Sequence, residues 1–183
     1  MRFPPFSILL PAVLVVPLCV AQAPTLGLQD GVLTFESPSF SVELVKDSQT
    51  LFSIKTKSNS MPFDFIPGDV MSQRQYNGNY HLGDLTFRAR IAGASSWTSG
   101  DTSAQRKNVT ALPVSGSTLA AANLGPTLPT GSLLNITRRW VLEDDELQLL
   151  FDVTNSQSKA VEVGSLGAPL EFNNVSKLLL KLA

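Results

Sequence analysis

The chain has 183 residues, of which 43% are hydrophobic and 16% are charged, and its formal net charge at pH 7 is −1. A balance so close to neutral excludes a surface that holds a nucleic-acid backbone or an anionic membrane by charge alone. One cysteine and one histidine exclude a metal site built only from Cys and His side chains, and we expect neither a metal nor a cofactor.

The N-terminus has the pattern of a secretory signal peptide. Arg2 precedes an apolar run over residues 8–20 that is too short, and too often interrupted by proline, to span a bilayer as a helix. Small residues predict cleavage after Ala21, so residues 1–21 are the predicted signal peptide. Cleavage after Ala23 and retention as an N-terminal anchor are the alternatives. Because cleavage also removes the only cysteine, we expect an extracellular protein without disulfides and without a membrane association.

Alternation of apolar and polar residues with a period of two predicts β-strands through the mature chain. Turn residues separate the strands, and no segment shows a strong helical period. The predicted strands cover residues 40–45, 51–57, 85–91, 109–114, 118–124, 134–142, 147–154 and 160–164. This spacing is typical of an all-β fold, and we expect one antiparallel β-sandwich domain over residues 22–174.

Two segments depart from the strand pattern. Residues 61–80 are rich in Gly, Pro, Asn and Asp, which predicts a long loop that either binds a ligand or covers a sheet edge. Residues 175–183 form a short tail with two lysines and an apolar stripe, which predicts a short C-terminal helix. A truncated product would end in this way, and a helix that docks on the sheet is the alternative.

Catalytic motifs are sparse. His81 enters a strand, and we expect it to make a structural hydrogen bond because no Gly-x-Ser-x-Gly turn supplies a nucleophile for it. Glycoside hydrolysis needs a pair of carboxylates. Asp64 and Asp69 in the long loop and Asp84 at a strand entry are candidates, but no spacing singles out a pair. The catalytic residues therefore stay unassigned.

Exposed aromatic side chains are the candidate carbohydrate contacts. Trp97 lies among Ser and Thr in a loop, and Tyr76 and Tyr80 lie in the long segment of residues 61–80. Trp140 lies in the middle of an apolar strand, so we expect it in the core. Trp97 is thus the better exposed candidate of the two tryptophans.

Three Asn-x-Ser/Thr sequons occur, and none has proline in the middle. They begin at Asn108, Asn135 and Asn174. Together with a signal peptide, they predict N-glycosylation on a eukaryotic secretory route, which requires these asparagines to point outward.

Several stretches of the chain, in this order after a signal peptide, resemble the N-terminal region of a secreted fungal family of uncharacterised glycoside-hydrolase-like proteins. They lie at residues 80–88, 106–113, 119–124, 138–140 and 169–174. The resemblance covers residues 32–174. It implies a β-supersandwich, similar to galactose-mutarotase-like domains, followed by an α/α toroid that carries the catalytic carboxylates. Family members continue for several hundred residues, whereas this chain ends nine residues after Asn174.

The resemblance implies a secreted, non-catalytic β-sandwich module of a carbohydrate-active protein, in which the sandwich is incomplete and a glycan is the partner. This chain alone is then expected not to hydrolyse glycosidic bonds and to bind glycans weakly. A stand-alone secreted enzyme that uses carboxylates near the Met61–Tyr80 loop is the alternative, and a structural module without a ligand is a third. Without its neighbouring toroid, the sandwich is expected to expose an apolar face near Phe172 and to self-associate through it.

Overall fold

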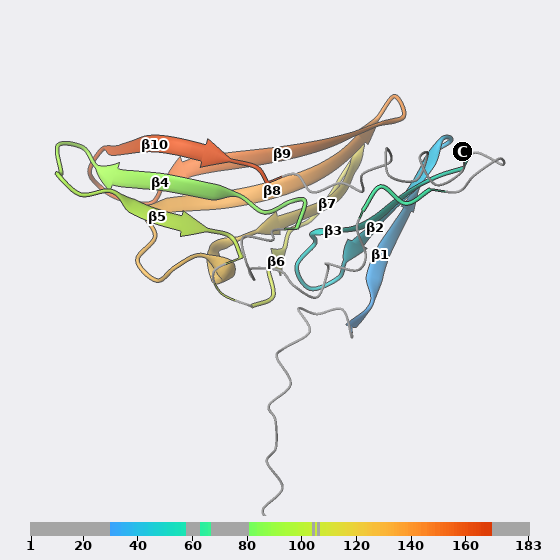
Figure 1. Cartoon of the computed structure of the whole chain (residues 1–183), viewed down its shortest axis with the longest axis horizontal. Coiled ribbons are helices and arrows are strands. Elements are labelled where there is room, and N and C mark those ends of the chain that lie inside the picture. The colour runs from blue at the N-terminus through green and yellow to red at the C-terminus, as the bar shows by residue number, and fades with distance from the viewer. Residues whose placement is uncertain (1–29, 58–62, 67–80, 104, 106, 170–183) are drawn as a thin grey trace, which may run out of the picture.

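The fold was obtained as a computed structural model (Figure 1), which describes residues 30–57, 63–66, 81–103, 105 and 107–169. These residues form ten strands and a 3₁₀ turn, and none of them lies in an α-helix. The elements are β1 (Val32–Glu36), β2 (Phe40–Val45), β3 (Leu51–Thr56), β4 (Thr86–Ile91), β5 (Thr98–Asp101), β6 (Thr110–Ala111), β7 (Thr118–Asn123), η3 (Gly125–Thr127), β8 (Leu134–Glu143), β9 (Glu146–Asn155) and β10 (Val161–Gly167). The predicted all-β class is confirmed.

The strands form three antiparallel sheets, with the orders β1-β2-β3, β10-β4-β5 and β6-β7-β8-β9. The long strands β8 and β9 run along the molecule, with β10-β4-β5 beside one half of them and β1-β2-β3 beside the other half (Figure 1). The four-stranded sheet is therefore one layer of a sandwich, and the two three-stranded sheets share the other layer.

Alternating burial along β8 explains how the four-stranded sheet packs against both three-stranded sheets. Its side chains at Leu134, Ile136, Arg138 and Trp140 are all buried, because every second residue of a strand faces the same side. Leu134 and Ile136 pack in a core with Phe87 of β4. Trp140 packs in a second core with residues of β2 and β3.

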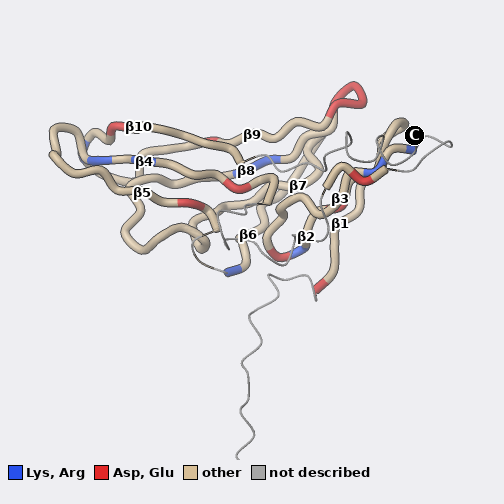
Figure 2. Tube along the Cα trace, viewed as in Figure 1, with Lys and Arg blue, Asp and Glu red and all other residues tan. Residues whose placement is uncertain are grey.

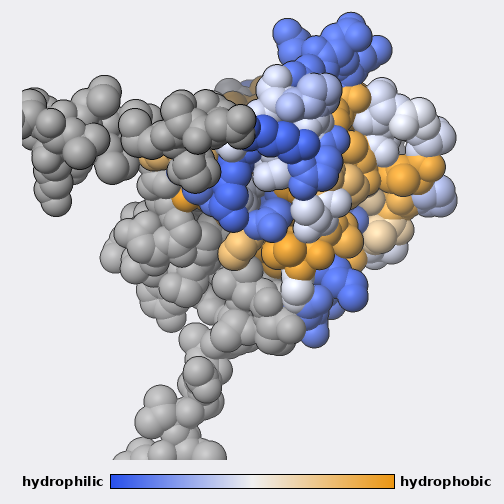
Figure 3. Space-filling model, turned by 90° about the vertical axis from the view of Figure 1, so that its right-hand side faces the viewer, coloured by the Kyte–Doolittle hydropathy of each residue, from blue (hydrophilic) through white to orange (hydrophobic). Residues whose placement is uncertain are grey.

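The first core joins the four-stranded sheet to β10-β4-β5. Its buried members are Leu85, Phe87, Ala89, Ala122, Leu124, Leu128, Leu134 and Ile136. The second core joins the same sheet to β1-β2-β3, and its buried members are Val42, Leu44, Val45, Leu51, Ile66, Leu82, Ala120 and Trp140. Figure 3, which views the molecule from the end at which β1-β2-β3 lies, shows hydrophobic surface beside strongly hydrophilic surface there.

The strand boundaries differ from the predicted ones in several places. β1 and β5 were not predicted, and β10 continues to Gly167 rather than ending at residue 164. The strand predicted over residues 109–114 shrinks to Thr110–Ala111, since Pro113 has no N–H to donate to a ladder. The predicted signal peptide, most of the 61–80 segment and the predicted C-terminal helix lie outside the described residues.

Candidate functional site

Trp97 places an aromatic ring on the outer face of the sheet β10-β4-β5. The residue directly precedes β5, and its ring centroid lies 4.4 Å from the guanidinium carbon of Arg90 and 5.6 Å from that of Arg88. The ring also lies close to β10, because a Cβ added to Gly164 would come within 2.7 Å of it. The half-buried indole therefore reaches across β4 from β5 to β10.

The strand register explains why these side chains meet. Phe87 and Ala89 of β4 face the core, so Thr86, Arg88 and Arg90 between them face outward. On neighbouring strands, Arg88 pairs with Ser99 of β5 and with Ser165 of β10. A bulge between Val163 and Ser165 leaves Gly164 beneath the ring. Glycine is the residue type that allows so close an approach.

A polar hollow of about 350 Å³ opens on this face, and Thr86, Arg88, Ser99, Gly100, Asp101 and Ser165 line it together with Phe87. Its hydroxyl groups can donate and accept hydrogen bonds. Asp101, at one end of β5, lines the hollow, whereas Trp97 directly precedes the other end of β5 and lies against Arg88, another lining residue. This is the arrangement of a shallow binding surface.

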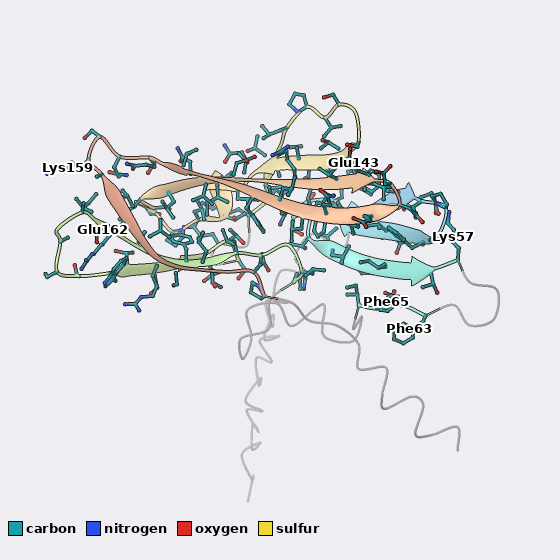
Figure 4. The ribbon with its side chains drawn as sticks, turned by 90° about the horizontal axis from the view of Figure 1, so that it is seen from above. Lys57, Phe63, Phe65, Glu143, Lys159 and Glu162 are labelled. Carbon is teal, nitrogen blue, oxygen red and sulfur yellow. The ribbon has the colours of Figure 1, made fainter. Side chains whose placement is uncertain are left out.

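The two arginines on this face, Arg88 and Arg90, differ in their ion pairs. Arg90 donates from Nε to Glu162 Oε2 at 2.7 Å, and Glu162 lies on β10 near Lys159 (Figure 4). Figure 2 shows the basic residues of β4 next to the acidic residue of β10. Arg88 is exposed, and none of the ion pairs found within the described part of the chain includes it.

The candidate carboxylate Asp64 organises backbone. Its carboxylate accepts hydrogen bonds from Ser53 Oγ at 2.8 Å, from the backbone N–H of Ile54 at 3.2 Å and from that of Ile66 at 3.0 Å. Phe63 and Phe65 flank it in sequence, and their rings meet edge to face (Figure 4). Asp64 therefore fastens residues 63–66 beside β3.

Asp84 and His81 belong to a buried polar cluster. Asp84 is 0% exposed, and its carboxylate accepts from the backbone N–H of His81 at 2.9 Å and from Thr102 Oγ1 at 3.1 Å. His81 Nδ1 lies 3.2 Å from Thr50 Oγ1. These contacts agree with the structural role expected for His81, and burial keeps Asp84 away from any large substrate.

Arg138 completes this cluster and was not singled out from the sequence. It is 1% exposed, and its guanidinium donates to the backbone carbonyl of Gly83 at 2.5 Å and to that of Ser48. Its place in the alternation of β8, between Ile136 and Trp140, is the signal that could have predicted its burial. The expected core position of Trp140 is confirmed, since this residue is 1% exposed and donates from Nε1 to the Gln49 carbonyl.

The other predicted sites are only partly described. Tyr76, Tyr80, Asp69 and Asn174 lie outside the described residues. Asn108 and Asn135 are both exposed.

A carboxyl pair lies beside one of these sequons. Burial and a hydrogen bond to Asp30 raise the pKa of Asp47 above its ordinary value of 3.8, and a hydrogen bond from Asn108 partly offsets that rise in pKa.

Within the described ranges, no group of three or more His, Cys, Asp or Glu side chains is placed to hold a metal ion. The same part of the chain contains no helix long and apolar enough to cross a membrane.

Comparison with protein families gives a match over most of the chain. The model of a family of unknown function (DUF5695) matches residues 43–178, a span that begins within β2 and includes β3 to β10, and with them the outer face that carries Trp97. No curated protein and no solved structure matches the chain.

Proposed function

The chain belongs to the family of unknown function DUF5695, and from that premise we propose that it is a secreted, non-catalytic β-sandwich module of a carbohydrate-active protein. The proposed contact with a glycan is the outer face of β10-β4-β5. Trp97 is its central residue, and the Tyr76 and Tyr80 side chains are further candidates.

The placement of Trp97 beside the polar hollow carries this proposal. Ligand sites combine an apolar wall with a few polar groups that fix orientation. Here the indole lies beside the hollow, against Arg88, while Thr86, Ser99 and Ser165 supply hydroxyl groups within it. A sugar ring matches such a surface because it offers C–H groups to an aromatic face and hydroxyl groups around its rim.

The described carboxylates favour binding over hydrolysis. A glycosidase of the usual kind needs two carboxyl groups that flank the scissile bond. Asp64 is engaged by Ser53 and two backbone N–H groups, and Asp84 is fully buried. The alternative, a stand-alone enzyme with carboxylates near residues 61–80, therefore draws no support from these two side chains.

Affinity electrophoresis in gels that contain plant or fungal polysaccharides tests the proposal. We expect weak retardation by at least one polysaccharide, lost in Trp97→Ala and kept in Arg139→Ala, which alters the outer face of the other layer. Because Trp97 packs on Gly164, thermal unfolding should show that the variant is folded. Ser99→Gln, which fills the hollow and leaves the indole in place, should also lose retardation. Absence of binding to every polysaccharide, or binding that both variants keep, would overturn the proposal.

Two further measurements separate the alternatives. Release of reducing sugars by the purified chain, abolished in Asp64→Asn or Asp69→Asn, would establish the enzyme instead. For secretion, N-terminal sequencing of the protein from culture medium should begin at Gln22. An intact Met1 on a membrane-bound product would contradict that part.

A further inference from the structure

We infer that the outer face of β10-β4-β5 selects acidic polysaccharides, with the guanidinium group of Arg88 binding the carboxylate of a uronate unit beside Trp97. The inference rests on the proposed function and adds the class of glycan. It concerns a charged side chain for which the fold itself provides no ionic partner within the described residues.

Arg88 differs from the other described arginines in its surroundings and its ion pairs. Arg90 is paired with Glu162 at 2.7 Å, and Arg139 is paired with Asp152 at 3.1 Å. Arg138 is buried and donates to backbone carbonyls. Arg88, by contrast, is exposed, and no ion pair within the described ranges includes it. Its planar group with five N–H donors is suited to a bidentate contact with a carboxylate.

The side chains around Arg88 leave its guanidinium open to a ligand. Ser99 and Ser165 flank it on the two neighbouring strands, so small hydroxyl side chains leave the guanidinium accessible from the hollow. Trp97 lies with its ring centroid 5.6 Å from the guanidinium carbon. A sugar that stacks against the indole thus has a cation within reach of a substituent on its ring.

Asp101 lies at the end of β5 that is farther from Trp97. Its Oδ1 accepts hydrogen bonds from the backbone N–H of Ser103 at 2.9 Å and from the Ser103 hydroxyl at 2.7 Å, which keeps this carboxylate at its own end of the hollow. The guanidinium of Arg88, at the strand position that pairs with Ser99, attracts an acidic group to its own part of the hollow. The volume, about 350 Å³, is at the lower end of the range of roughly 300–1,000 Å³ for small-molecule sites, which fits recognition of a short stretch of chain.

Two glycans with the same backbone, one with carboxylates and one with neutral methyl esters, provide the test. Polygalacturonate and its fully methyl-esterified form share a backbone, and titration calorimetry of the whole chain with each of them measures the preference. We expect about fivefold tighter binding of the acidic form, the effect of one exposed ion pair. The preference should shrink as salt rises from about 0.01 M to about 0.15 M, because the Debye length falls from ~30 Å to ~8 Å.

Variants assign the preference to one side chain. Arg88→Gln should bind the two forms equally. Arg139→Gln, which removes an arginine from the other layer, should keep the full preference. A preference that survives in Arg88→Gln would overturn the inference, as would dextran sulfate that binds as tightly as polygalacturonate, since that would show a response to charge alone.

The outcomes also distinguish this inference from the proposed function. Equal binding of the two forms by the unaltered chain, sensitive to Trp97→Ala, would overturn the acidic selectivity and leave the glycan-binding module standing. Failure to bind any polysaccharide, neutral or acidic, would overturn both.

Discussion

The guanidinium of Arg138 on β8 donates a hydrogen bond of 2.5 Å to the backbone carbonyl of Gly83, which precedes β4. A second donation from the same group reaches the carbonyl of Ser48, in the turn between β2 and β3. One side chain of the four-stranded sheet therefore holds segments that lead to each of the two facing sheets.

Replacement of this arginine should destabilise the domain. Arg138→Met keeps much of the apolar volume but leaves the carbonyls of Gly83 and Ser48 without these donors, and each buried polar group left unsatisfied costs about 1–3 kcal/mol. We expect a loss of about 2–4 kcal/mol in the free energy of unfolding, measured by urea denaturation. Arg139→Met is the matched control on the next residue, because its exposed pair with Asp152 contributes up to about 1 kcal/mol. Equal effects of the two variants would contradict this role.

Strands with long alternation were predictable from the sequence. The predictions over residues 134–142 and 147–154 match β8 and β9, in which apolar residues at every second position have to face one side. β5 escaped prediction because Thr98–Asp101 contains small polar residues and no apolar alternation. The segment is a strand because it pairs with β4, and this pairing cannot be read from the residues of β5 alone.

The candidate site was predictable only in part. The sequence singled out Trp97 as the better candidate for an exposed aromatic, because it lies among Ser and Thr residues, and the structure has it half-buried. The sequence did not show that Arg88, Arg90 and Gly164 would surround the ring, since this depends on the register of β10 against β4 and on the bulge within β10. Register between distant strands is set by packing of the whole layer, which local patterns do not encode.

The carboxyl group of Asp47 should make stability depend on pH. Its pKa is raised in the folded state, first by burial and then by Asp30, so the folded protein holds this proton more tightly than the unfolded chain does. The resulting stabilisation is complete below the ordinary pKa of 3.8 and is lost as the pH rises through the raised pKa. Asp47→Asn, which is always neutral at this position, should therefore be more stable than the unaltered chain at pH 7. The gain in the free energy of unfolding should be at most about 1 kcal/mol, because solvent partly screens the charge of Asp47.

Urea denaturation of unglycosylated protein at pH 3 and pH 7 measures this effect. The gain from Asp47→Asn should be present at pH 7 and absent at pH 3. Asp144→Asn, in the exposed turn between β8 and β9, is the control and should show no such change. A larger gain at pH 3 than at pH 7 would refute the sign.

N-glycosylation is predicted at both described sequons. Asn108 and Asn135 are exposed, and Asn135 pairs with Thr154 on the outer face of the four-stranded sheet, away from Trp97. In a secreting eukaryotic host, Asn108→Gln and Asn135→Gln should each remove one glycan, seen as a step in electrophoretic mobility. Protein whose mobility does not change after glycosidase treatment would count against both sites.

Self-association is predicted through β10. Val163 and Leu166 on this edge strand are 45% and 52% exposed, and they lie close in sequence to Phe172, where an uncovered apolar face was expected. Sedimentation velocity should show concentration-dependent association, reduced in Val163→Ser/Leu166→Ser. The control Val114→Ser removes an equally exposed side chain between β6 and β7. A monomer at all concentrations would rule the interface out.

Gly164→Ala should move the Trp97 ring away from its position over β10. The added Cβ would lie 2.7 Å from the indole, closer than side chains tolerate, so the ring has to shift. We expect loss of polysaccharide retardation and stronger quenching of tryptophan fluorescence by acrylamide, since Trp140 is 1% exposed and contributes little to quenching. Gly167→Ala is the control for the quenching measurement, because it adds the same methyl group to β10 but against Thr86 Oγ1 rather than the indole. Unchanged quenching and unchanged binding in Gly164→Ala would contradict this prediction. The position of the Trp97 ring would then not depend on Gly164, and the binding face would not depend on that position.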